Sequence, residues 1–156
     1  MQWVYDPHRG GVKIPERTKD RTRQRILAYA EEHYHGKYVR IKVRFRKQFC
    51  DIDAYTEPFL AEDFPPAGWH ETREEALERM RKHPLQLCRL RHFSKDRWSV
   101  AYYSYSHEHY DETFFETGED IGTPEEGFEV GAMYLHDTWD GKMTEDERAW
   151  QTVQKK

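Results

Sequence analysis

The sequence has little that points to a secreted, membrane-spanning or disulfide-bonded protein. It has only two cysteines, Cys50 and Cys88, which are too few for a disulfide framework. No apolar run approaches the length that spans a bilayer. Residues 1–7 lack the basic start and apolar run of a signal peptide. We therefore expect a cytoplasmic protein with no membrane association and with reduced thiols.

Catalytic and cofactor motifs are also missing. There is no nucleophile elbow, phosphate-binding loop or dinucleotide fingerprint. His33-x-His35 and His107-x-His109 each place two imidazoles on one face of an extended segment, but a zinc site needs three or four ligands. We therefore predict no native metal and no cofactor, and we favour a protein that is not an enzyme.

Apolar residues are scarce for a folded chain. Hydrophobic residues make up 37% of the sequence and aromatic residues 15%, so we expect a small core built largely from Trp, Tyr and Phe. Charged residues reach 35%, but the aromatic content and clear periodicities argue against disorder. At 156 residues, the chain is expected to form a single domain, residues 1–156. Thr144 and Glu147 predict a docked tail helix within 137–156.

Acidic residues are scarce in one long segment of the chain, and basic residues are scarce in another. Residues 9–47 hold 13 Lys/Arg against 4 Asp/Glu, and residues 107–147 hold 14 Asp/Glu against one lysine. The overall charge of −4 hides this separation. Either the two segments neutralise each other in the fold, or one of them is offered to a partner.

The clearest local pattern is an alternating strand over 39–46, followed by a second strand over 49–55. A turn at Lys47-Gln48 gives one pairing, and a slip of one residue would turn every side chain to the wrong face. Because Lys-Gln is not a favoured turn pair, a four-residue loop of the same parity is the alternative. This register pairs apolar residues on one face and opposite charges on the other: Phe45 with Cys50, Val43 with Ile52, Ile41 with Ala54, Arg44 with Asp51, and Lys42 with Asp53.

The remaining patterns alternate helices with hairpins. A helix is predicted from Pro15 to about His33, and capping boxes start helices at Thr72 and Thr123. A second hairpin is predicted over 85–106 and a further strand over 113–116. The fold class is therefore α+β: an antiparallel sheet of four to six strands built from hairpins, with three or four helices packed mainly on one face.

Side-chain alternation in the second hairpin predicts two faces. Cys88, Leu90, Ala101 and Tyr103 form one face, which makes Tyr103 a core residue. Trp98, Val100 and Tyr102 lie on the other face with Arg89 and Arg91.

The basic segment predicts a surface for nucleic acid or another phosphate-rich partner. Its candidate contacts are Arg17, Arg21, Arg25, Arg40, Lys42 and Arg44. Tyr38 and Tyr55 fall on the same strand face as the arginines and are candidates to stack bases. The alternative is that Asp51, Asp53 and the acidic segment neutralise these cations.

Two other functions remain open. A protein–protein module would use Phe59, Phe64 and Trp69 of the long loop over 57–70, or would present the acidic 107–147 region to a basic partner. A small metal-dependent hydrolase would use Asp51, Asp53 and a histidine such as His107.

Three segments resemble small uncharacterised bacterial proteins of unknown function. They are residues 5–15 (YDPHRGGVKIP), residues 49–58 (FCDIDAYTEP) and residues 122–132 (GTPEEGFEVGA). The resemblance implies a bacterial source and carries no activity, ligand or catalytic residue.

Overall fold

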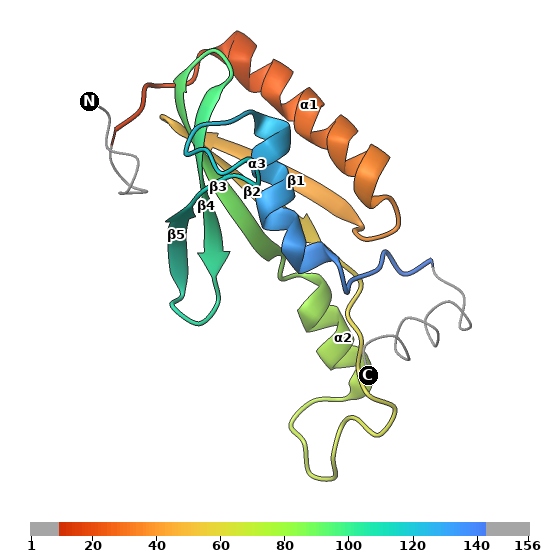
Figure 1. Cartoon of the computed structure of the whole chain (residues 1–156). Helices are drawn as coiled ribbons and strands as arrows, with labels where there is room; N and C mark the ends of the chain where they lie inside the picture. Colours follow the sequence, from red (N-terminus) through yellow and green to blue (C-terminus); the bar gives the residue numbers. More distant parts are fainter. Residues whose placement is uncertain (1–9, 143–156) are drawn as a thin grey trace.

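The strands run in chain order across a single antiparallel sheet, and helices pack on one of its faces (Figure 1). This computed structural model describes residues 10–142. The elements are α1 (Glu16–Tyr34), β1 (Arg40–Arg46), β2 (Phe49–Tyr55), α2 (Arg73–Arg81), β3 (Leu85–Ser94), β4 (Arg97–Ser104), β5 (His109–Thr113), α3 (Pro124–Gly131) and the 3-10 turn η1 (Ala132–Leu135). The predicted α+β class is confirmed, and the last strand lies earlier than the predicted 113–116.

The first hairpin has the register that its alternation predicts. Val43 lies opposite Ile52, Arg44 opposite Asp51 and Lys42 opposite Asp53. Lys47 takes up the left-handed backbone conformation, with φ 55°, that a two-residue turn requires. The apolar face of β1 is therefore held toward the helices and its basic face away from them.

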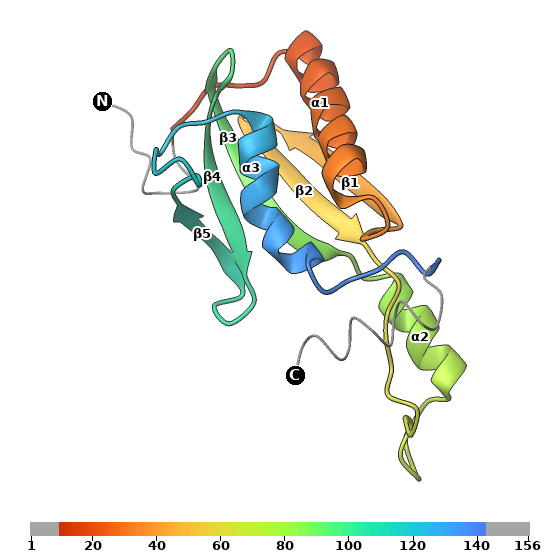
Figure 2. The ribbon, with the colours of Figure 1, turned by 45° about the vertical axis from the view of Figure 1, so that its right-hand side comes forward.

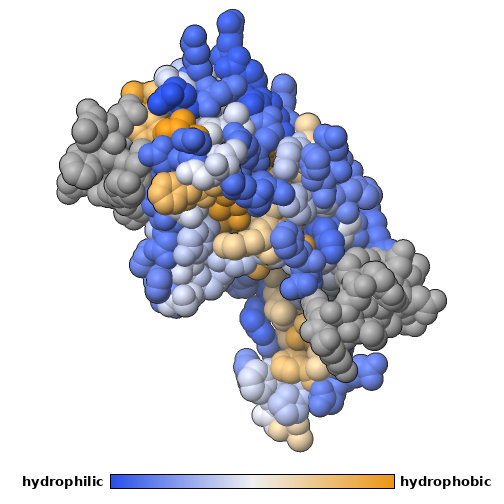
Figure 3. Space-filling view, viewed as in Figure 1, coloured by the Kyte–Doolittle hydropathy of each residue, from blue (hydrophilic) through white to orange (hydrophobic). Residues whose placement is uncertain are grey.

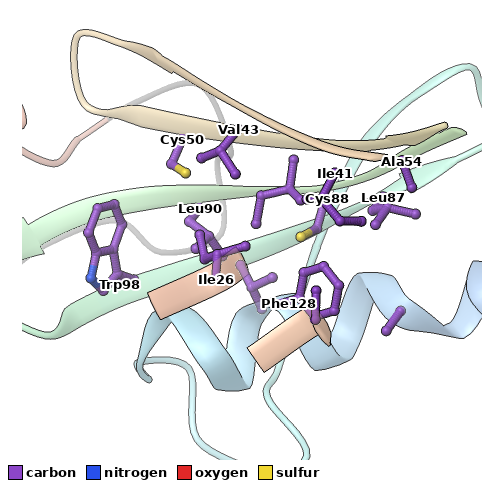
Figure 4. Close-up of a cluster of buried hydrophobic side chains, with 14 of the residues drawn as sticks. Ile26, Ile41, Val43, Cys50, Ala54, Leu87, Cys88, Leu90, Trp98 and Phe128 are labelled. Carbon is purple, nitrogen blue, oxygen red and sulfur yellow. The ribbon is translucent and has the colours of Figure 1, made fainter. Parts of the chain in front are cut away.

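The core lies between the sheet and the two helices α1 and α3, which cover the same face (Figures 2 and 4). Ile26 of α1 and Phe128 of α3 are fully buried there against Ile52 and Leu90 of the central strands. Most of the buried cluster is aliphatic, so the predicted aromatic core is wrong for the part of the chain described. Four tyrosines, Tyr29, Tyr34, Tyr38 and Tyr134, pack against this cluster while only partly buried.

Two glycines let α3 approach the sheet closely. A Cβ on Gly127 would lie 2.3 Å from Leu90 Cδ2, and one on Gly131 would lie 2.9 Å from the carbonyl carbon of Leu87. Only a residue without a side chain fits at these contacts.

A β-bulge reverses the predicted faces of β4. The register of β3 with β4 shifts between His92 and Ser94, and Leu90 then lies opposite Val100. Trp98 is consequently in the core, whereas Tyr103 is only partly buried on the opposite face. The predicted placement of both residues is therefore wrong, because the extra residue of a bulge changes the parity of the strand that follows.

Residues 57–84 form an arm that projects beyond the end of the sheet (Figures 1 and 2). The arm consists of the predicted long loop and α2, whose capping box at Thr72 is present. Within residues 10–142, every helix is too short or too polar to span a lipid bilayer. Within the tail helix predicted over 137–156, residues 137–142 are not helical and residues 143–156 lie outside the described residues.

Candidate nucleic-acid interface

β1 is an edge strand whose two faces have opposite character. Ile41 and Val43 are buried in the core beside α1, and the alternate residues Arg40, Lys42 and Arg44 are exposed on the other face. A strand rises about 3.3 Å per residue, so these cations stand roughly 6.6 Å apart. Charge on an edge strand also prevents pairing with other chains. Position alone therefore does not establish that they bind a ligand.

α1 contributes the two cations Arg17 and Arg21, which are exposed and one helical turn apart. The helix buries Thr22, Ile26 and Ala30, and this turns positions 17 and 21 outward. Arg23 links the helix to β1, because its guanidinium lies 5.1 Å from the centroid of the Phe45 ring. Arg17 and Arg21 instead share a helical row with Arg25, whose guanidinium pairs with Glu125 of α3. The cations of α1 therefore lie on the α3 side of the helix, and those of β1 lie on the outer face of the sheet.

Two of the six predicted contacts are neutralised within the fold. The Arg25 guanidinium forms a bidentate pair with Glu125, at 2.8 Å and 2.6 Å, and also contacts Asp96 at 2.6 Å. Its hydrogen bond to Glu125 raises the pKa of Arg25 above the usual range. Arg44 contacts Asp53 at 2.8 Å. These two arginines have structural partners and are the weakest candidates for phosphate contacts.

The other four predicted contacts keep their charge open. Within residues 10–142, no carboxylate forms an ion pair with Arg17, Arg21, Arg40 or Lys42. We call these four residues the basic edge; they form two pairs, one on α1 and one on the outer face of β1. Lys42 lies opposite Asp53, as predicted, and its charge counters the rise in the Asp53 pKa that burial causes, but the direct ion pair of Asp53 is with Arg44.

The two tyrosines predicted to stack bases differ in placement. Tyr55 lies beneath the Arg40 guanidinium, which is 4.5 Å from its ring centroid. Tyr38 packs against the core, and its hydroxyl donates to Glu31 at 2.7 Å. The Arg40–Tyr55 pair therefore presents one planar group on the outer face, and the prediction for Tyr38 is wrong.

Asp51 and Asp53 are each held by an arginine of a neighbouring strand. Arg89 donates to Asp51 at 2.7 Å, while Arg44 contacts Asp53. Asp53 is only 3% exposed, and burial raises the pKa of its carboxyl against the opposing effect of Arg44. His107 pairs with Asp111 on β5. The structure thus does not bring together the three residues of the predicted hydrolase.

The aromatic residues of the arm differ in exposure. Phe59 is 58% exposed and Trp69 is 45% exposed, whereas Phe64 is partly buried with its ring centroid 5.7 Å from that of Trp69. Arg73 orders the loop, because its guanidinium donates to the backbone oxygens of Leu60, Ala61 and Phe64. Hydrophobic residues run along the arm in Figure 3. The arm is a structured element with apolar side chains in solvent.

The acidic segment is partly used inside the fold. Glu125 pairs with Arg25, and Glu112 pairs with Arg91 at 2.6 Å. A hollow of about 190 Å³ between α1 and α3 is lined by Tyr29 and by Glu116, Thr117, Glu125, Glu126 and Glu129. Its carboxylates would repel a phosphate, so it does not extend the basic edge.

The sequence prediction missed one cluster of possible metal ligands. His107, His109 and Asp111 place one ligand atom each within 4.8 Å of one another. The signal was present, because Asp111 continues the two-residue spacing of the His-x-His pair on a strand. The prediction considered the two histidines without that third position.

Comparison with protein-family models, curated proteins and solved structures finds no match for this chain. The bacterial source implied by the resemblance stays a prediction.

Proposed function

We propose that this protein is a small cytoplasmic binding or accessory module that contacts nucleic acid, or another phosphate-rich partner, through the basic edge. The observation that supports this proposal is that four cations on α1 and β1 form no direct ion pair with a carboxylate among the described residues. Uncompensated Lys and Arg attract phosphates and release counterions on binding. The buried free thiols of Cys50 and Cys88 agree with a reducing compartment.

A single strand is the best specific partner. The Arg40 guanidinium over Tyr55 offers a planar surface on which an unpaired base can stack. Because the protein is acidic overall, we expect moderate affinity that depends strongly on salt.

The test is fluorescence anisotropy of labelled single-stranded RNA and DNA at low and physiological salt. We expect binding that weakens with salt, and weaker binding for Arg40→Ala/Lys42→Ala. Each lost phosphate contact lowers the salt slope by about 0.7 for a single strand, so this double variant should lower it by roughly 1.4.

The matched control removes two positive charges from the arm, as Arg79→Ala/Lys82→Ala. It changes net charge equally and should leave affinity and slope close to those of the unmodified protein. Absence of binding at low salt, or an equal loss in both double variants, would overturn the proposal.

A second candidate function is protein–protein interaction through the arm. It is favoured by the exposure of Phe59 and Trp69 on an element that projects from the sheet. Aromatic side chains of this kind anchor many interfaces. Trp69→Ala should abolish co-purification of a partner while leaving stability intact. Phe114→Ala removes a similarly exposed ring, 53% exposed, from outside the arm and should not affect it. Loss of folding in Trp69→Ala would exclude this function for that residue.

A further inference from the structure

Three metal-ligating side chains meet at the turn that joins β4 to β5, visible at the free end of that hairpin in Figure 1. Asp111 lies between the two imidazoles, with Oδ2 2.7 Å from His107 Nδ1 and Oδ1 2.7 Å from His109 Nε2. The two imidazole rings are stacked with centroids 5.5 Å apart. The cluster lies outside the basic edge and is used by neither candidate function.

The hairpin itself holds these side chains on one side. His109 and Asp111 are alternate residues of β5, opposite Ser104 and Tyr102 of β4. Glu108 has a φ of 57°, which bends the chain between the two histidines, and Ser104 Oγ accepts a hydrogen bond from the backbone N–H of His107 at 3.2 Å. The turn therefore has a defined backbone that presents the cluster to solvent.

The chemistry of the donors favours one class of ion. Two imidazoles and a carboxylate are suited to Zn²⁺ and neighbouring divalent transition metals, whereas Mg²⁺ and Ca²⁺ prefer oxygen ligands.

The spacing of the donor atoms is close to that of a zinc site. Zinc–ligand bonds of about 2.0–2.1 Å set tetrahedral ligand atoms roughly 3.3 Å apart. The donor atoms lie within 4.8 Å of one another, and both imidazoles are exposed, so metal binding requires only their rotation toward Asp111. Three protein ligands would leave the fourth position for water or a partner's donor.

We propose that His107, His109 and Asp111 form a binding site for Zn²⁺ with one open coordination position. The inference does not rest on the proposed nucleic-acid function. The competing explanation is that Asp111 only accepts hydrogen bonds from the two imidazoles and orders the turn.

The experiment is calorimetric titration of the untagged full chain with ZnCl₂, because a histidine tag would itself bind zinc. We expect one Zn²⁺ per chain and no saturable binding of MgCl₂. The variant His107→Ala/His109→Ala should lose zinc affinity by more than tenfold, since it removes two ligands directly. Circular dichroism should show an unchanged fold, because both imidazoles are exposed.

Two further variants separate the site from general histidine binding and from turn structure. His33→Ala/His35→Ala removes the other His-x-His pair and should leave the affinity unchanged. Asp111→Asn retains an oxygen that accepts from an imidazole but lacks the anionic ligand, so it should weaken zinc binding at least tenfold with the turn intact. If His107→Ala/His109→Ala does not fold, the zinc affinity of Asp111→Asn tests the proposal. Unchanged affinity in Asp111→Asn, an equal loss in the His33/His35 variant, or no saturable zinc binding would overturn the proposal.

Discussion

The helices α2 and α3 begin with the same capping motif but occupy different environments in the fold. In α2, Thr72 accepts from the backbone N–H of Glu75 at 3.1 Å; in α3, Thr123 accepts from that of Glu126 at 3.2 Å. In both, the glutamate accepts in return from the threonine backbone N–H. Yet α3 lies against the sheet and α2 projects with the arm.

The difference comes from the residues that follow each cap. Six of the nine residues of α2 are charged, and it buries only Ala76. α3 buries Pro124, Gly127, Phe128 and Gly131, whose small and apolar side chains form a face that fits the sheet. A capping box therefore starts a helix, but the apolar and glycine positions decide whether the helix joins the core.

The largest difference between α3 and α2 is expected when the main apolar side chain of each helix is truncated. Phe128→Ala should lower the free energy of unfolding by about 3–5 kcal/mol, because it leaves a cavity beside Ile26 and Leu90. Leu77→Ala in α2 should cost about 1 kcal/mol or less, since Leu77 is only partly buried. Urea denaturation measures both values. Similar losses in the two variants would contradict the contrast.

The next largest effect on stability is expected from adding a side chain where α3 lies closest to the sheet. Gly131→Ala should destabilise the protein by about 1–3 kcal/mol, because its Cβ would lie 3.0 Å from Cys88 Sγ and 2.9 Å from the Leu87 backbone. This exceeds the helix propensity of up to about 1 kcal/mol that alanine adds. Glu78→Ala on the exposed side of α2 is the control and should change stability by less than about 0.5 kcal/mol. A stabilised Gly131→Ala variant would show that the helix can move away from the sheet.

Removing either capping threonine should destabilise its own helix to the same extent, but only the cap of α3 should affect the stability of the whole protein. Thr123→Ala and Thr72→Ala each remove a cap worth about 1 kcal/mol. The first should shift the urea midpoint, because α3 unfolds with the core. The second should increase hydrogen exchange over residues 73–81 and leave the midpoint in place. A midpoint shift of equal size in Thr72→Ala would show that the arm unfolds with the sheet.

The smallest expected effect is a pH dependence of folding stability that comes from His92 in β3, within the sheet and not the arm. Burial lowers the pKa of the His92 imidazole below its usual value near 6.5. The unfolded chain then binds a proton that the folded state resists, so stability from this group is present above about pH 6.5 and is lost as pH falls toward the lowered pKa. Urea midpoints between pH 7.5 and 5 should fall, and His92→Leu should reduce that fall. An equal fall in His92→Leu would assign the pH dependence to other groups.

Much of the local structure was predictable because it rests on near neighbours in the chain. The register of β1 with β2 follows from alternation on both strands, and the capping boxes follow from residues three apart. The ion pair between Arg25 and Glu125 was not predictable, since 100 residues separate its partners. The ion pair of Asp53 with Arg44 was not predictable either, because it depends on how far the side chains reach and not on the strand register.

The amino-acid sequence by itself determined the α+β class, the first hairpin and the starts of α2 and α3, because periodicity and capping act over a few residues. The tertiary structure alone decided which cations remain open on the basic edge and that Trp98 lies in the core. It also decided that His107, His109 and Asp111 meet. These outcomes depend on a bulge, on the packing of α1 against α3 and on the bend at Glu108, where distant or non-repeating contacts outweigh the local pattern.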